Sequence, residues 1–109
     1  MIVDEFRYSL EFFKELIEKR EIDASLLASM DRRLCDISNH IAVCHRVVAE
    51  KRSEAKTIIA IFSLRESKLL QEAERAGETL NEVIELQSQF LSARAEVLSE
   101  LLNGKTHNK

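Results

Sequence analysis

The residues best suited to chemistry lie close together, because the stretch CDISNHIAVCH holds both cysteines and two of the three histidines of the chain. Cysteine and histidine bind zinc, and two cysteines can form a disulfide. Cys35 and Cys44 are nine residues apart in sequence. In an α-helix with about 3.6 residues per turn, that spacing places them on opposite sides. If this stretch is one continuous helix, we expect two free thiols and no disulfide between them.

His40 and Cys44 are one helical turn apart and could share a metal ion. Zinc takes four ligands, so the others would have to come from another helix or from a second copy of the chain. The alternative is a structural role, in which Cys44 packs in an apolar row as a small hydrophobic residue. We favour the structural role and predict neither a metal nor a cofactor.

Asp36, Ser38 and His40 are the residue types of a hydrolytic triad, but side chains so close along one helix diverge and cannot form the triad geometry. A phosphate-binding loop is also excluded, because the only glycines, Gly77 and Gly104, are far apart in sequence. We therefore expect that the protein is not an enzyme.

These residues must be positioned by helices, because the chain has no proline and only two glycines in 109 residues. We predict an all-α fold in which long amphipathic helices form a helical hairpin or a three- to four-helix bundle with coiled-coil-like packing. Gly77 can close a helix, and Thr79 with Glu82 resembles a capping box that opens one. The predicted single domain spans residues 1–103, with helices at about 2–20, 24–76 (possibly interrupted) and 79–103, before a flexible tail at 104–109.

The central helix carries an apolar row with alternating steps of three and four residues, the repeat of a coiled coil. Lys51 interrupts the row and is predicted to help fix the register between two copies. Helices this long do not easily cover their own apolar rows, so we predict a homodimer. The predicted dimer interface consists of Leu27, Met30, Leu34, Ile37, Ile41, Cys44, Val48, Ile58 and Phe62.

The two outer helices carry their own apolar rows. The row of the first helix is Val3, Phe6, Leu10, Phe13 and Ile17, widened by Ile2, Phe12 and Leu16. The row of the last helix is Leu80, Ile84, Gln87, Leu91, Ala95, Leu98 and Leu102, backed by Val83, Phe90, Val97 and Leu101. Phe6, Phe12 and Phe13 are candidates for docking on another protein. The alternative is that they pack inside the bundle.

Charge favours a protein partner over a nucleic acid or a membrane. The net charge is −3, and only residues 23–56 carry a small basic excess. The candidate nucleic-acid contacts there are Arg32, Arg33, Arg46 and Arg52. Most aromatic residues lie instead in the acidic first helix, away from a phosphate-binding surface. That helix lacks the basic face of a membrane-surface helix, and no apolar run reaches the roughly 18 residues that a membrane span needs.

The sequence thus predicts a non-catalytic protein–protein interaction module, such as an adaptor, an assembly or export chaperone, or a small inhibitor, that acts as a helical homodimer. Its expected partners are itself and another, unidentified protein. The alternative is a small helical regulator that contacts nucleic acid through the arginines of the central helix. Without a secretory signal, two thiols are most simply placed in the cytoplasm.

Overall fold

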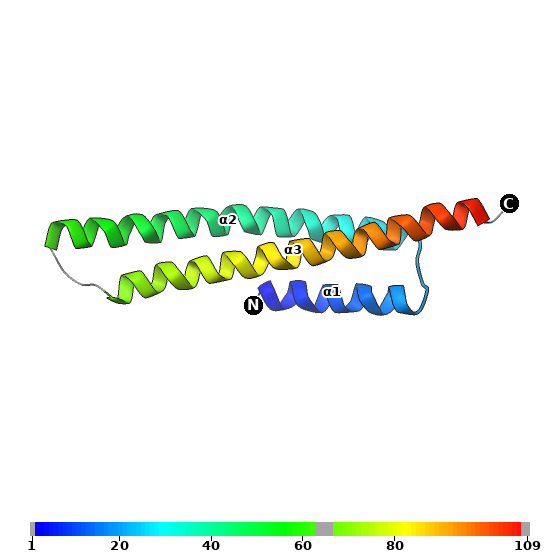
Figure 1. Ribbon diagram of the computed structural model, residues 1–109, viewed down its shortest axis with the longest axis horizontal. Coiled ribbons are helices and arrows are strands. Elements are labelled where there is room, and N and C mark those ends of the chain that lie inside the picture. The colour runs from blue at the N-terminus through cyan, green and yellow to red at the C-terminus, as the bar shows by residue number, and fades with distance from the viewer. Residues whose placement is uncertain (1, 63–66, 108–109) are drawn as a thin grey trace. The chain divides into compact units, whose positions relative to one another are not determined.

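The computed structural model describes the backbone of every residue except 1, 63–66 and 108–109. It consists of three helices, α1 (Ile2–Glu18), α2 (Ala24–Phe62) and α3 (Ser67–His107), and the described part of the chain contains no strand (Figure 1). This confirms the predicted all-α class and the packing of its helices as a helical hairpin or bundle.

The break between the long helices is not where the sequence indicated. α2 ends at Phe62, and Gly77 and Thr79 lie inside α3. Gly77 does not take the positive φ that closes a helix. The Thr79 hydroxyl donates to the Arg75 carbonyl at 3.1 Å, a bond made within a helix rather than at its start. α3 also continues to His107, through much of the predicted tail.

A tight corner joins α1 to α2. Arg20 has a φ of 60°, the left-handed conformation that ends many helices. The amide of Glu21 donates to the Leu16 carbonyl at 2.9 Å, and the amide of Arg20 donates to the Ile17 carbonyl at 3.1 Å. This pair of bonds is a Schellman motif. The Asp23 carboxylate then caps α2 by accepting a hydrogen bond from the Leu26 amide at 2.8 Å.

The chain divides into two compact units. The first unit comprises Met1–Ser38 and Glu85–Lys109, so α1 packs there with the start of α2 and the later part of α3. Phe13 meets Phe90 edge to face at a centroid distance of 5.9 Å, and Phe90 is completely buried. The described core of this unit consists of Val3, Phe6, Leu10, Phe13, Ile17, Leu26, Met30, Ile37, Leu86, Phe90, Ala93 and Val97.

Among the described residues of this first unit, polar side-chain contacts join α3 to α2 and to the corner between α1 and α2. Arg94 pairs with Asp31 between α3 and α2, and Arg20 Nη1 lies 3.2 Å from Glu100 Oε2. The Gln87 amide donates to the Ser38 hydroxyl at 3.4 Å. All three are at the surface, where such contacts contribute little free energy to folding. Burial of the aromatic core therefore dominates the stability of this unit.

The second unit, Asn39–Ile84, pairs the rest of α2 with the start of α3. Its described core is smaller: Cys44, Val48, Ala55, Ala73, Leu80 and Val83. Lys51 Nζ lies 3.5 Å from Glu72 Oε2. The polar residue that we expected to fix the register between two copies thus pairs with α3 of its own chain.

The apolar row of α2 is largely covered within a single chain. Met30 and Ile37 have no exposed surface, and Cys44 and Val48 are 7% and 6% exposed. A buried side chain offers no surface to a second copy, so this fold does not support these four residues as a dimer interface. Leu27, Leu34 and Ile41 are half-buried. The side chains of Ile58 and Phe62 lie outside the described part of the structure.

Candidate functional site

The cysteine and histidine cluster is spread around α2. Cys35 is exposed and Cys44 is buried, and both are free thiols. Burial raises the pKa of the Cys44 thiol above its ordinary value of 9.0, because the thiolate would lose its hydration. Metals bind the thiolate, so this environment opposes ligation by Cys44. Over the described residues, no three His, Cys, Asp or Glu side chains gather as a metal site would require.

The three phenylalanines predicted to dock on a partner have different environments. Phe6 and Phe13 are only 1% and 5% exposed, so they belong to the core and offer almost no surface to a partner. The alternative of packing inside the bundle is thus correct for these two. Phe12 is 55% exposed. Of the three, only Phe12 has the accessible surface that docking requires.

Phe12 borders a groove between α1 and α2. Two hollows of about 280 and 300 Å³ share Phe13 and Ser29, and together they form what we call the α1–α2 groove. The short side chains of Ser25 and Ser29 leave room along α2. The groove is lined by Phe12, Phe13, Leu16, Glu21, Asp23, Ser25, Leu26, Ser29, Arg32, Arg33 and Asp36.

The two ends of the α1–α2 groove carry different charges. Glu21 and Asp23 lie at the end near the corner. Arg32 and Arg33 lie at the other end, where Arg33 Nη1 is 3.6 Å from Asp36 Oδ2. Arg32 is exposed and forms no ion pair with any described residue. A ligand in this groove would therefore meet Arg32 as a cation whose charge is not balanced by any described acidic side chain.

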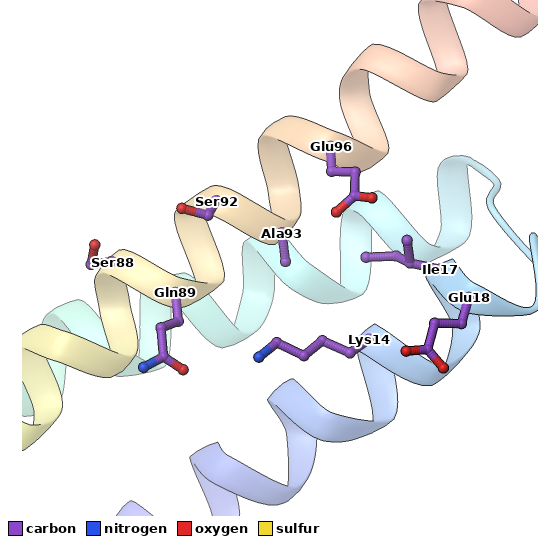
Figure 2. A pocket seen from close by; sticks show the side chains of 8 residues that line it. All are labelled: Lys14, Ile17, Glu18, Ser88, Gln89, Ser92, Ala93 and Glu96. Atoms are coloured by element: carbon purple, nitrogen blue, oxygen red, sulfur yellow. The ribbon is translucent and has the colours of Figure 1, made fainter.

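A third hollow, of about 400 Å³, lies on the other side of α1, against α3 (Figure 2). Ile17 and Ala93 supply its buried apolar surface, and the Lys14 side chain extends across it toward Gln89. Its remaining lining is polar: Glu18, Ser88, Ser92 and Glu96. Neither serine is hydrogen-bonded to a base among the described residues, so this hollow lacks the pairing that activates a nucleophile. Its mixed charges also favour no particular ligand.

The arginines considered for nucleic-acid binding are not equivalent. Arg32, Arg46 and Arg52 are exposed on α2, whereas Arg33 is half-buried and paired with Asp36. Exposed acidic residues, including Asp31, Asp36, Glu50 and Glu54, interrupt the same helix. Alternating charge of this kind is typical of a solvated helical face and weakens attraction to phosphates.

The serines and Leu26 of the α1–α2 groove were not predicted as site residues. A serine beside a buried position does not indicate a groove in the sequence, because the helix that packs against it is not yet known. The main row predicted for the last helix is largely exposed, whereas three of its four predicted backing residues, Val83, Phe90 and Val97, are buried. The buried residues there are Leu80, Val83, Leu86, Phe90, Ala93 and Val97, whereas Ile84, Leu91, Leu98 and Leu102 are exposed.

Comparison of the chain with protein families, curated proteins and solved structures finds no match in any of the three. None of the helices, over the residues described, combines the length and the hydropathy needed to cross a membrane. Over its described residues, the chain forms three helices with an amphipathic groove between α1 and α2.

Proposed function

We propose that the protein is a non-catalytic interaction module whose α1–α2 groove holds an amphipathic helical segment of another protein, with acidic residues at the end that lies near Arg32. The observation that carries this proposal is that Phe12, 55% exposed, lies on a groove that also contains Arg32, which forms an ion pair with none of the described residues. An aromatic and an arginine are the residue types that most often dominate protein interfaces.

The apolar contribution comes from the exposed Phe12 and the half-buried Leu16, both on α1. Covering the exposed part of Phe12 contributes about 1–2 kcal/mol, at about 25 cal/mol per Å² of apolar surface. Ser25 and Ser29 leave space between the helices for apolar side chains of the partner. A helix that places leucines on one face fits this arrangement, as amphipathic helices fit grooves in other proteins.

The charged contribution determines the direction of the partner. A carboxylate at the Arg32 end gains an ion pair that no described residue of the chain makes, whereas carboxylates at the other end would meet Glu21 and Asp23. Charge complementarity of this kind mainly sets specificity and the rate of association. We therefore expect discrimination against a segment with the opposite distribution of charge.

The test uses a fluorescent synthetic helix with leucines on one face and glutamates at one end, titrated with the full chain and followed by anisotropy. Replacing Phe12 by alanine should weaken binding about tenfold, which corresponds to roughly 1.4 kcal/mol. The matched control is Tyr8→Ala, because Tyr8 is 70% exposed on α1 but lines neither hollow of the groove. Tyr8→Ala should leave binding unchanged.

Reversing the charge at Arg32 provides the second part of the test. Arg32→Glu should abolish preference for the acidic peptide and favour a peptide whose glutamates are replaced by lysines. Lys14→Glu, which alters a cation in the other hollow, should have no such effect. Equal binding of both peptides by the unmodified chain, or equal losses in Phe12→Ala and Tyr8→Ala, would show that the groove is not the site.

The same titration with a labelled oligonucleotide examines the rival function. Nucleic-acid binding through α2 should fall steeply as salt rises, and it should be lost in Arg46→Glu but not in Phe12→Ala. That pattern, without peptide binding, would overturn our proposal.

We further propose a cytoplasmic location, because an exposed thiol such as Cys35 stays reduced most readily there.

A further inference from the structure

α3 has a second apolar row, on the side away from its buried one. Leu91, Leu98 and Leu102 are 51%, 36% and 57% exposed, and Ala95 between them is also exposed. We call these four residues the outer leucine row. The buried residues of the same stretch, such as Phe90 and Val97, face the core. A helix with apolar rows on two sides has more apolar surface than its own chain covers.

The spacing of the outer leucine row indicates that its partner is a helix. Its steps are four, three and four residues, so Leu91 and Leu98, and likewise Ala95 and Leu102, are each seven residues apart. This repeat keeps a row in continuous contact with a second helix. Ala95 and the exposed Ser92 and Ser99 are small, which allows the two backbones to approach closely.

Charge distinguishes the possible partners. The outer leucine row and its neighbours Ser92 and Ser99 are all uncharged. Of the flanking residues, Arg94 is paired with Asp31, and Glu96, like Ser92, lines the 400 Å³ hollow between α1 and α3. A neutral row can meet an identical row without like charges facing each other, and it has no charge with which to select a different protein.

We propose that a second copy of the chain packs along the outer leucine row, so that two copies associate through α3. The row spans about 17 Å, at 1.5 Å per residue. An interface this short buries less surface than stable complexes usually do, so the dimer dissociates in the micromolar range or above. This inference goes beyond the proposed function, because it gives the assembly two α1–α2 grooves and thereby bivalent binding.

Sedimentation equilibrium of the full chain, from low micromolar to near-millimolar concentration, tests the proposal. The chain should shift from monomer to dimer as concentration rises, and Leu98→Glu and Leu91→Glu should each raise the dissociation constant at least about tenfold. Val43→Glu is the matched control, because Val43 is a 46% exposed apolar residue on α2, and it should leave the dissociation constant unchanged. Circular dichroism confirms that each variant is folded.

Two results would overturn the inference. One is a monomer across the whole concentration range. The other is a dimer that survives Leu91→Glu and Leu98→Glu, which would place the contact on another face. Phe12→Glu separates this inference from the proposed function, since it removes the aromatic side chain from the groove and should leave the outer leucine row intact. Loss of the dimer in Phe12→Glu alone would mean that copies associate through the groove instead.

Discussion

Phe12 and Phe13 are adjacent residues of the same type in opposite environments, with exposed fractions of 55% and 5%. Replacing Phe13 by alanine removes its contact with Phe90 and leaves a cavity in the aromatic core. We expect this change to lower the free energy of unfolding by about 3–5 kcal/mol. Phe12→Ala should lower it by less than about 1 kcal/mol, because most of that side chain already contacts water.

Urea unfolding followed by circular dichroism measures both values. Comparable losses in the two variants would contradict the assignment of Phe13 to the core and Phe12 to the surface. The pair also controls the binding experiment, because a stable Phe12→Ala chain shows that reduced peptide binding does not come from unfolding.

The two thiols should differ in reactivity. In Cys44→Ser, the remaining Cys35 is exposed and should react quickly with a disulfide reagent such as dithiobis-nitrobenzoate. In Cys35→Ser, the remaining Cys44 should react at least about tenfold more slowly, because the helices must open first. Stopped-flow absorbance gives both rates. Equal rates at neutral pH would mean that Cys44 is not buried in solution.

Cys44 also makes stability depend on alkaline pH. Its folded-state pKa lies above the ordinary value of 9.0, so the folded chain holds the thiol proton more tightly than the unfolded chain does. The contribution of Cys44 to stability should be complete below pH 9.0 and should be lost as pH rises through the higher folded-state pKa. Urea unfolding at neutral and alkaline pH should show this loss in the natural chain but not in Cys44→Ala.

At the scale of the helices, Gly77 lies inside α3 instead of ending a helix. A Cβ at this position would meet only the tip of the flexible Arg52 side chain, at 4.0 Å. Gly77→Ala should therefore raise the free energy of unfolding by about 0.5–1 kcal/mol, because alanine loses less backbone entropy in a helix.

Gly104→Ala is the matched control for Gly77→Ala. A Cβ at Gly104 would meet no heavy atom of the described residues within 4 Å, but Gly104 lies in the last turns of α3, where helices fray. Gly104→Ala should therefore raise the free energy of unfolding by less than Gly77→Ala does. A destabilised Gly77→Ala chain would indicate that a turn exists at this position in solution.

The helices also show which structural features the sequence patterns could predict. In α1 the predicted row Val3, Phe6, Leu10, Phe13 and Ile17 is buried without exception, because that helix has one dominant apolar side. α3 has two apolar rows of similar strength, and periodicity alone could not tell which one faces the core. The choice is made by contacts with other helices, such as the contact of Phe90 with Phe13, and these are distant in sequence.

The α1–α2 groove likewise has one part that the sequence could predict and one part that it could not. Phe12 could be proposed from the sequence, because a phenylalanine beside the main row widens the apolar side of the helix. The hollow beside it could not, since it arises where Ser25 and Ser29 of one helix lie opposite the aromatic residues of another. The sequence allowed an interruption within 24–76 but did not give its position, because no glycine or proline lies between Phe62 and Ser67.

On the scale of the whole molecule, the two compact units should differ in stability. Among the described side chains, the first unit buries Phe6, Phe13 and Phe90, whereas the second buries no aromatic residue and depends on smaller ones such as Ala55 and Ala73. Burial of less apolar surface provides less free energy against local opening.

Hydrogen–deuterium exchange with mass spectrometry measures this difference. Peptides from residues 39–57 and 68–84 should exchange faster than peptides from 24–38 and 85–102, although all four belong to helices. Uniform protection along α2 and α3 would indicate that the two units open together as one cooperative structure.

The contrast between the two cysteines has a practical consequence. A maleimide dye should attach selectively at Cys35 in the natural chain, with no engineered residue, since the other thiol is enclosed. That position is three residues beyond Arg32 on the same helix. The natural chain therefore offers a chemical handle within about one helical turn of the groove, from which changes in fluorescence on ligand addition can be followed.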